Sequence, residues 1–457
     1  MEGKKLPLSV KLGYGAGEFG PDIFYIVAAM VLMYFLTDTV GLAAGLAGTA
    51  LMIGRIWDAF YDPIIGHISD KAVTRMGRRR PFILGGAIVF AIAMVFLFTN
   101  PALVLGSGIS ETTIFIYVVI TYIIICTAYS TVFIPYASLA PELTTDYHER
   151  TSLMSYRFAF GIPATLVGAG LALPIVGLCQ DRSMGFVLMG AIFGITVLVS
   201  ALVMVFMVKE PAHARPVSSM SFWESYRSIF KNKPYVLILT TYVLNQLGVT
   251  LMSAAVIYYC KYILDAESMV TIAMVILLVT AFIFVPINVL VSKKLGKKIP
   301  YGLGLIIMAI ALVLVFCFGH SMGVNFFLVM VFIVGIGQGF TYASPYTIVA
   351  DAIEYDYSLT GQRREGVFLG VWSWFAKVSQ ALAVFLMGLT LQFMGYVPNI
   401  MPQTPSSQLG IELFLGPVNA VLFVVAAIVL YFYPITQERY KEILAQIAER
   451  EEKTTAN

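Results

Sequence analysis

Long apolar stretches recur through the whole chain and constrain its fold more than any other feature. A helix needs about 20 apolar residues to cross the hydrocarbon of a bilayer. Only 12% of the residues are charged, against about 25% in soluble domains. The pattern predicts an all-α membrane protein with twelve transmembrane helices, at roughly 16–38, 46–69, 82–99, 113–138, 152–177, 185–207, 235–260, 268–291, 301–319, 325–349, 367–394 and 411–433.

Lys and Arg gather in alternate connections, namely the N-terminus, the second-to-third, middle, eighth-to-ninth and tenth-to-eleventh loops, and the tail. The other loops hold essentially Arg182 and Lys261. Because cytoplasmic loops carry the excess of basic residues, both termini are expected in the cytoplasm, which requires an even number of crossings. We therefore expect a multi-pass protein of the cytoplasmic (inner) membrane.

The longest polar connection divides the twelve spans into two sets of six. We expect an N-terminal half at 1–207, a middle loop at 208–234, a C-terminal half at 235–433 and a cytoplasmic tail at 434–457. Within the middle loop, SFWESYRSIFKNK (221–233) predicts a short amphipathic helix at the membrane interface, with a calmodulin-type target helix as the alternative. Basic, glycine-containing loops at matching places, 66–80 and 292–298, suggest a weak internal repeat.

Composition and motifs exclude several classes of function. A net charge of +3 is too small for a nucleic-acid partner, and the four cysteines lie singly in apolar segments without metal-site or disulfide spacing. No GxxxxGK(S/T) motif is present, which excludes a primary ATP-driven pump. We expect no enzyme activity and no cofactor.

Three charged residues interrupt the second apolar stretch: Arg55, Asp58 and Asp62. Positions 58 and 62 stack on one face of a helix, and position 55 lies one turn earlier. A carboxylate inside a bilayer is unfavourable unless it is paired, hydrated or neutralised. Two carboxylates spaced i,i+4 therefore predict an ion or proton site.

The loop that follows, GHISDKAVTRMGRRR, resembles the major facilitator pattern GxxxD(R/K)xxGR(R/K), with a longer spacing between its Asp and its second Gly. The matching positions are Gly66, Asp70, Lys71, Gly77, Arg78 and Arg79. The pattern suggests a gate in which Asp70 pairs with cytoplasmic Arg residues and holds the halves together. The alternative is a solvated charge run that only sets topology, which would leave Gly66 and Asp70 unexplained.

Several motifs together resemble the glycoside, pentoside and hexuronide cation symporter family, typified by the melibiose permease. They are GxGxxG with Asp22, RIWDAxxDPxxG from Arg55 to Gly66, GRRRPFIL, GxRxEG from Gly361 to Gly366, Lys377 and GYVPN. The resemblance covers about residues 11–400 and implies the major facilitator fold. The first glycines precede no strand-and-helix unit, so they are not a nucleotide fingerprint.

The resemblance implies a cation site at Asp58 and Asp62 with a helix-four hydroxyl at Ser130. The alternative for the two carboxylates is structural charge pairing with Arg55 and Lys377, which is compatible with cation exchange. The family's neutral Asn between the two carboxylates is replaced here by Tyr61. A phenol is a poorer Na⁺ ligand than an amide, so we expect H⁺ coupling over Na⁺.

For the substrate, the resemblance implies Asp22, Arg157 and Lys377, with Phe133 and Ala137 at positions where the melibiose permease has an Asp and a Trp. Losing that acceptor and stacking surface argues against the same galactoside. The alternative for Asp22 is an interfacial charge at the start of the helix. Trp374, Tyr346 and Gln338 are further cavity candidates, each with packing as the alternative. A second gate is expected at Asp351, Glu354 and Arg363.

Together these features predict a symporter that couples a monovalent cation gradient to import of a small polar solute, a sugar or a uronide. One alternative is a cation-coupled transporter of an amphiphile such as a lysolipid. Another is a membrane sensor that transports nothing. The expected partners are the substrate, the cation and the lipid bilayer, with no nucleic acid, and nothing in the sequence demands more than a monomer.

Overall fold

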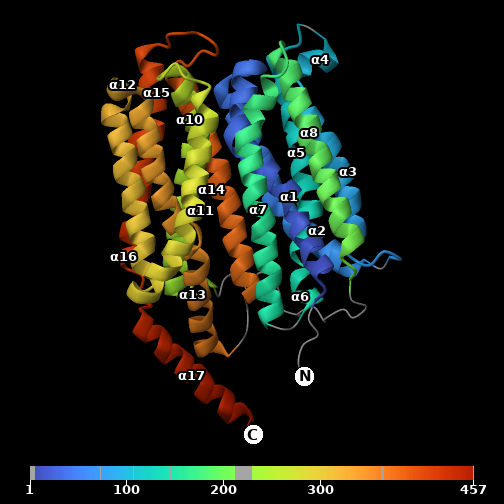
Figure 1. Cartoon of the computed structure of the whole chain (residues 1–457), viewed down its shortest axis with the longest axis vertical. Helices are drawn as coiled ribbons and strands as arrows, with labels where there is room; N and C mark the ends of the chain where they lie inside the picture. The colour runs from blue at the N-terminus through green and yellow to red at the C-terminus, as the bar shows by residue number, and fades with distance from the viewer. Residues whose placement is uncertain are drawn as a thin grey trace.

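The computed structural model describes residues 6–72, 74–106, 108–144, 147–210, 229–361 and 365–455, and every regular element in these ranges is helical (Figure 1). Residues 221–228 of the expected amphipathic helix and Arg363 of the expected gate lie outside them. The first helices are α1 (Leu8–Val27), η1 (Ala28–Leu32), η2 (Phe35–Thr39), α2 (Ala44–Lys71), α3 (Arg80–Leu97), α4 (Pro101–Leu105), α5 (Glu111–Ala137), α6 (Ala140–Leu143), α7 (Tyr147–Val176) and α8 (Arg182–Met207).

The remaining helices follow residue 229 and end near the C-terminus. They are α10 (Lys233–Tyr262), α11 (Met269–Leu295), α12 (Lys298–Tyr342), α13 (Ser344–Thr360), α14 (Glu365–Phe393), α15 (Pro405–Leu413), η3 (Phe414–Val418), α16 (Asn419–Tyr431) and α17 (Gln437–Thr455). Both termini lie at one end of the molecule, beside α6 and α17 (Figure 1). We call this the terminal end, and the end that carries α4 and α15 the opposite end.

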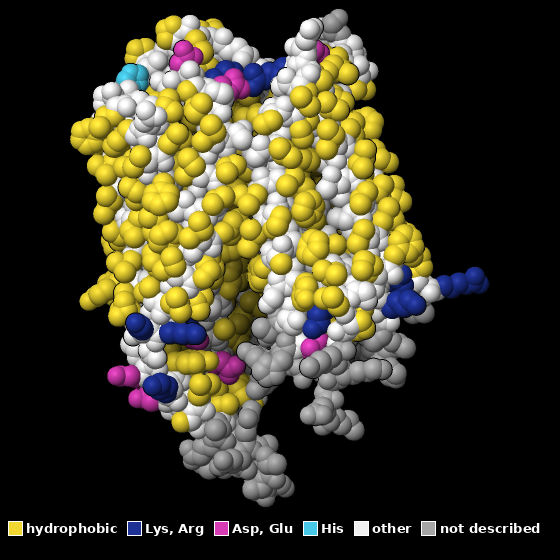
Figure 2. All heavy atoms as spheres, in the orientation of Figure 1, with side chains coloured by type: hydrophobic (Ala, Val, Ile, Leu, Met, Phe, Trp, Pro, Cys, Tyr) yellow, Lys and Arg dark blue, Asp and Glu magenta, His cyan; other side chains and the backbone are white. Residues whose placement is uncertain are grey.

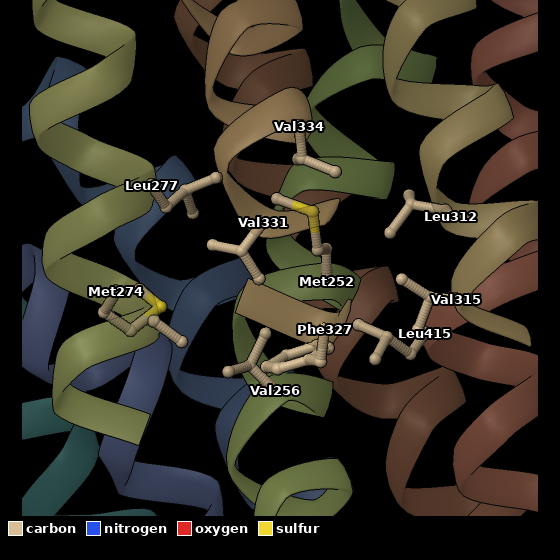
Figure 3. Close-up of a pocket in the computed structure, with 11 residues that line it drawn as sticks. Met252, Val256, Met274, Leu277, Leu312, Val315, Phe327, Val331, Val334 and Leu415 are labelled. Carbon is tan, nitrogen blue, oxygen red and sulfur yellow. The ribbon is translucent and has the colours of Figure 1, made fainter. Parts of the chain in front are cut away.

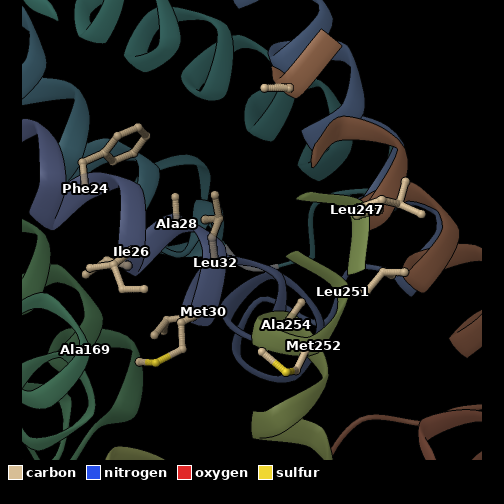
Figure 4. Close-up of a cluster of buried hydrophobic side chains, with 14 of the residues drawn as sticks. Phe24, Ile26, Ala28, Met30, Leu32, Ala169, Leu247, Leu251, Met252 and Ala254 are labelled. Atoms are coloured by element: carbon tan, nitrogen blue, oxygen red, sulfur yellow. The ribbon is translucent and has the colours of Figure 1, made fainter. Parts of the chain in front are cut away.

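The long helices pack as two bundles. In the first bundle α1 packs on α7 and α8, and α5 packs on α2 and α3; in the second, α10 packs on α14 and α16, and α12 on α11 and α16. The bundles meet where α2 contacts α14, α7 contacts α11, and η1 contacts α10. Figure 4 shows part of this seam, with buried side chains of α1 and η1 near those of α10.

Ten helical stretches of the described chain are long and apolar enough to span a membrane, two fewer than the sequence predicts. Two features account for the difference. The stretch Lys298–Thr360 counts once although α12 contains a break at Gly323, where φ is 72° and the chain is not helical. Helix α2 is not among the ten, and it is the helix that carries Arg55, Asp58 and Asp62.

The lateral surface is apolar, and the described Lys and Arg side chains gather toward the two ends (Figure 2). Between the bundles the same view shows a hollow in the half of the molecule nearest the terminal end. Toward the opposite end, α2 and α14 touch through glycines. A Cβ added to Gly388 would lie 2.4 Å from the carbonyl oxygen of Ala44, so this approach needs a residue without a side chain.

Candidate functional site

Three charged side chains from different bundles meet at the expected cation site. Lys377 on α14 places its Nζ 2.7 Å from Oδ2 of Asp58 and 2.5 Å from Oδ2 of Asp62, both on α2. The Oγ of Ser130 on α5 donates to Oδ1 of Asp58 at 2.5 Å. Asp58 is 1% exposed, so an ammonium and a hydroxyl replace the water that a carboxylate would otherwise need. We call Asp58, Asp62, Ser130 and Lys377 the charge cluster.

Helix geometry explains why α2 and α5 supply the cluster. Asp58 and Asp62 are one turn apart and face the same neighbour. One turn before Asp58, a Cβ on Gly54 would lie 2.2 Å from the Tyr122 ring of α5, so only glycine permits this approach. The close crossing brings Ser130 within hydrogen-bond distance of Asp58.

Arg55 is not a direct partner of the two carboxylates among the described ion pairs. Its Cζ instead lies 6.0 Å from the centroid of the Tyr25 ring on α1. The sequence left both Arg55 and Lys377 open as pairing partners, and the structure joins Lys377 to both acids. Arg55 is held at the edge of the same region by an aromatic face.

Tyr61 points to a different neighbour from the charge cluster. Its hydroxyl lies 3.3 Å from Oγ1 of Thr131 on α5, and its ring stacks on Trp57 with centroids 6.2 Å apart. The indole of Trp57 in turn donates to Oγ1 of Thr127 at 2.8 Å. The structure therefore brings Ser130, but not Tyr61, into contact with the carboxylates.

The substrate residues expected in the first bundle lie around Arg157 of α7. Its Nη2 is 2.7 Å from Oε1 of Glu18, and its Cζ lies 5.3 Å from the ring centroid of Phe133. Asp22 lies on the same side of α1 and close to α7. A Cβ added to Gly161 of α7 would lie 2.4 Å from Oδ2 of Asp22. Ala137 is half-buried in the last turn of α5. No motif or spacing in the sequence indicates that Glu18 is the partner of Arg157.

In the second bundle, aromatic side chains stand near the expected site. Trp372 is buried and stacks on Tyr242 with centroids 4.1 Å apart, and the hydroxyls of Tyr242 and Tyr346 are 3.1 Å apart. Trp374 is half-buried and packs edge-on against Phe375. Gln380, one turn after Lys377, donates to the Tyr25 hydroxyl at 2.9 Å.

The expected gate residues pair within their own bundles. Arg79 contacts Asp70 at 2.6 Å and Glu142 at 2.8 Å, and Arg78 contacts Glu142 at 3.1 Å. In the second bundle Asp351 pairs with Lys297 at 2.6 Å, and Glu354 follows one turn later on α13. A Cβ on Gly66 would meet only an ordinary contact, 3.6 Å from Ile134. No described ion pair joins the two bundles at the terminal end.

Glu210, which the sequence did not single out, holds the start of α3. Its two oxygens accept hydrogen bonds from the backbone N–H groups of Arg78, Arg79 and Arg80 at 2.6, 2.8 and 2.7 Å. A carboxylate stabilises free N–H groups and the positive end of the helix dipole at an N-terminus. Gly77, with φ of 108°, leaves room for it, because a Cβ there would lie 2.7 Å from Cδ of Glu210.

A buried polar network joins the bundles at the opposite end, and we call it the cross-bundle network. Asp38 accepts hydrogen bonds from Lys261 at 2.9 Å, Tyr396 at 2.6 Å, Thr37 at 2.7 Å and Tyr262. Its members are Tyr34, Thr37, Asp38 and Arg182 of the first bundle and Tyr258, Lys261, Tyr262, Glu267, Tyr396 and Asn399 of the second.

Lys261 is satisfied on three sides within this network. Besides Asp38, its ammonium donates to the Tyr34 hydroxyl and to Oδ1 of Asn399, each at 2.9 Å. Asp38 and Lys261 are 7% and 9% exposed. Arg182 and Glu267 form a more exposed ion pair beside them. Arg182 and Lys261, essentially the only basic residues in the loops that otherwise lack Lys and Arg, are thus both used to join the bundles.

Two cavities lie away from the charge cluster. One of about 650 Å³ lies beside the Arg182–Glu267 pair, between the ends of α7 and α11. The other, shown in Figure 3, is lined only by apolar side chains of the second bundle, including Met252, Met274 and Phe327. Its volume of about 20 Å³ indicates a packing gap rather than a ligand site.

Known proteins resemble this chain over nearly its whole length. Residues 13–437 match the family described as MFS/sugar transport protein. The chain is 28% identical to the glucuronide carrier protein homolog of Escherichia coli (strain K12), with 96% of this chain and 95% of that protein covered. It is 27% identical to the isoprimeverose transporter of Lactiplantibacillus pentosus, covering 94% and 89%.

Among solved structures, that of a D-xylose-proton symporter matches with a TM-score of 0.67 and 15% identity, covering 94% of this chain and 98% of that one. At this identity the likeness concerns the fold alone.

The family match and the transporter relatives, together with the many helices apolar enough to span a membrane, identify a multi-pass transporter of the inner membrane, and not an enzyme. The chain belongs to the MFS/sugar transport protein family, because that family's model covers most of its length. The resemblance to glycoside and hexuronide cation symporters read from the sequence is confirmed.

Proposed function

We propose that this protein is a secondary symporter that couples a monovalent cation gradient to the import of a small polar solute, a sugar or a uronide, by alternating access. One contact carries the proposal: Lys377 from the second bundle lies on both Asp58 and Asp62 of the first. Relatives named as a glucuronide carrier homolog, an isoprimeverose transporter and a putative glycoside/cation symporter support the same class.

The contact suggests how a cation and the bundle motion are linked. The Lys377 ammonium stands where a transported cation would stand, between two carboxylates 2.7 and 2.5 Å away. A proton or Na⁺ that neutralises those carboxylates weakens their hold on Lys377, and with it one tie between the bundles. Cation binding then shifts the equilibrium between the arrangements of the two bundles, which is the requirement for coupling.

The proposal includes twelve membrane crossings with both termini in the cytoplasm. Counting α2 as a crossing, and α12 as two crossings separated by the break at Gly323, gives twelve. The basic loops of the sequence then lie on the side of the terminal end. The bundles are joined at the opposite end and hollowed toward the terminal end (Figure 2), which supports the proposal that this state opens toward the cytoplasm.

H⁺ is the favoured coupling ion. Na⁺ prefers several hard oxygen ligands, and Ser130 is the one hydroxyl in the described chain that contacts the carboxylates. Tyr61, at the position of the family's Asn, is turned toward Thr131. Two acids that share one ammonium can also share a proton. Uptake should follow an inward proton gradient in Na⁺-free buffer, and Tyr61→Asn should add Na⁺ stimulation; a wild-type requirement for Na⁺ would overturn this choice.

Asp58→Asn and Asp62→Asn test the coupling role in proteoliposomes. Each variant should lose gradient-driven accumulation, because each removes an ionisable group from the charge cluster, while substrate binding is retained. Asp181→Asn, at the N-cap of α8, is the matched control and should accumulate substrate normally. Uphill transport by both single variants at the wild-type level would rule out the assignment.

A second candidate is a cation-coupled transporter of an amphiphile such as a lysolipid. Phe133 and Ala137 favour it, because they give the cavity wall beside Arg157 an apolar character. A thermal-shift screen with sugars, uronides and lysolipids discriminates the two candidates. Protection by sugars or uronides alone supports the leading proposal, whereas protection by lysolipids alone favours the second.

A further inference from the structure

One uncharged hydrogen bond joins the bundles beside the charge cluster. Nε2 of Gln380 on α14 donates to the hydroxyl of Tyr25 on α1 at 2.9 Å. Gln380 lies three residues after Lys377, so both side chains leave the same face of α14. That face therefore makes two different ties to the first bundle: a charged one to α2 and a neutral one to α1.

Tyr25 and Gln380 stand where the solute would have to lie. Tyr25 is one turn after Asp22 on α1, and its ring faces the guanidinium of Arg55. Tyr25 is 37% exposed although it lies within a stretch apolar enough to span a membrane, Leu8–Leu32, whereas Gln380 is 7% exposed. A small solute that enters between the bundles would meet the exposed phenol first and the amide behind it.

Two of the basic side chains near this pair are already engaged in ion pairs. Arg157 is held by Glu18 at 2.7 Å, and Lys377 is held by Asp58 and Asp62. Opening either ion pair would leave a buried charge without a partner, which is strongly unfavourable. Opening the Tyr25–Gln380 bond leaves only neutral groups, and a solute hydroxyl can satisfy both of them.

We propose that Tyr25 and Gln380 determine specificity by exchanging their mutual hydrogen bond for hydrogen bonds to an uncharged, hydroxyl-bearing solute such as a glycoside ring. This inference rests on the proposed function and names its substrate class. A phenol both donates and accepts, and a carboxamide offers a carbonyl oxygen and an NH₂ group. Neighbouring sugar hydroxyls complement such a pair, while the pair itself offers no positive charge to the carboxylate of a uronide.

The test uses the full chain in proteoliposomes with matched uncharged glycosides and uronides, methyl glucoside and methyl glucuronide among them, under an imposed cation gradient. We expect the best substrate to be uncharged. For that substrate, Tyr25→Phe and Gln380→Leu should each raise KM about tenfold, the effect of one neutral hydrogen bond, and leave kcat and the cation-to-solute ratio unchanged. Ser379→Ala is the control, because Ser379 is buried and donates to the carbonyl of Ala376.

A deoxy series of the best substrate separates recognition from a merely structural tie. Removing the sugar hydroxyl that bonds to Tyr25 and Gln380 should raise KM for the wild type. With that deoxy sugar, Tyr25→Phe should raise KM no further. Preference for the uronide, or an unchanged KM in both variants of a chain that transports, overturns this inference alone. A wild type that accumulates no member of the panel overturns the proposed function as well.

Discussion

The two ends of the molecule use charge in opposite ways. At the opposite end, Asp38 of the first bundle and Lys261 of the second are buried in one shared network. At the terminal end, Asp70 and Arg79 pair inside the first bundle, and Lys297 and Asp351 pair inside the second. The comparison shows that charged pairs join the bundles at one end, while at the other each bundle satisfies its own charges and can separate.

The two ends also differ in how completely their charges are removed from water. Asp38 accepts four side-chain hydrogen bonds, and Lys261 donates three. Separating the bundles there would break this buried set as a unit. Asp70, with 32% of its side chain exposed, remains within reach of water. We therefore expect substitutions of the buried Asp38–Lys261 pair to have larger effects than substitutions at the terminal end.

The largest effect is expected for Asp38→Asn. Removing one partner of a buried ion pair is unfavourable by about 3 to 5 kcal/mol, because the other charge is left without compensation. The closed opposite end should become the minor state. In a cysteine-free background with Tyr25→Cys, labelling by an impermeant reagent added at the opposite side should rise by more than about tenfold.

The double variant Asp38→Asn with Lys261→Met is the control for Asp38→Asn. It removes both charges and should recover part of the closed population, since neither partner is left alone. Equal labelling of Asp38→Asn and of the chain with Asp38 intact would show that the network does not hold this end closed.

Gly388→Leu should have the next largest effect, by preventing the contact of α2 with α14. A Cβ at position 388 would lie 2.4 Å from the carbonyl oxygen of Ala44, and overpacking of this kind destabilises by about 1 to 3 kcal/mol. The same labelling assay should report opening at the opposite end. Gly85→Leu is the matched control, because a Cβ at Gly85 meets nothing within 4 Å and labelling should not change.

Asp70→Ala probes the terminal end and should act on turnover. Arg79 retains its ion pair with Glu142 at 2.8 Å after the change, so only part of its charge pairing is lost. We therefore expect kcat to fall by about threefold to tenfold. Equilibrium substrate affinity should remain as in the wild type, because Asp70 is remote from the charge cluster. Weaker affinity with unchanged turnover would contradict a gating role.

Glu267→Gln should have the smallest effect, roughly 0.2 to 1 kcal/mol on closure, because the Arg182–Glu267 pair is partly exposed. Burial alone would raise the pKa of Glu267, but hydrogen bonding and charge from Arg182 outweigh it and lower that pKa. The ionised pair thus stabilises the closed state of the opposite end at pH values above the ordinary Glu pKa of about 4.3. This stabilisation is lost as the pH falls through the lowered pKa of Glu267. Labelling of wild type and variant should converge once the pH has fallen below the lowered pKa of Glu267.

The charge cluster could be predicted in outline from the sequence, because acids and a base inside apolar stretches have few tolerable arrangements. Asp58, Asp62 and Lys377 stood out for that reason, and the structure places them in contact. The helical class of the fold followed from the lengths of the apolar stretches. The break at Gly323 lies in the gap that the sequence predicts between the helices at 301–319 and 325–349.

The cross-bundle network and the neutral tie could not be predicted. Asp38 and Lys261 each lie at the end of an apolar stretch, where a charge is ordinary, and 223 positions separate them. Tyr25 and Gln380 are uncharged, so neither contrasts with its surroundings. Tyr61 shows the converse limit: helical spacing allowed it to face the carboxylates, but its contact with Thr131 is decided by packing on α5.

The exclusion of α2 from the stretches apolar enough to span a membrane has a consequence for biogenesis. Each charged residue at the centre of an inserting helix adds about 2.5 to 3.5 kcal/mol to its transfer from the translocon into lipid. Arg55, Asp58 and Asp62 enter together, and Lys377 follows more than 300 residues later in synthesis. With α2 as one of the twelve proposed crossings, we expect the nascent helix to pack on α5, its main neighbour in the first bundle, until α14 arrives, so that its final placement is a late event in assembly.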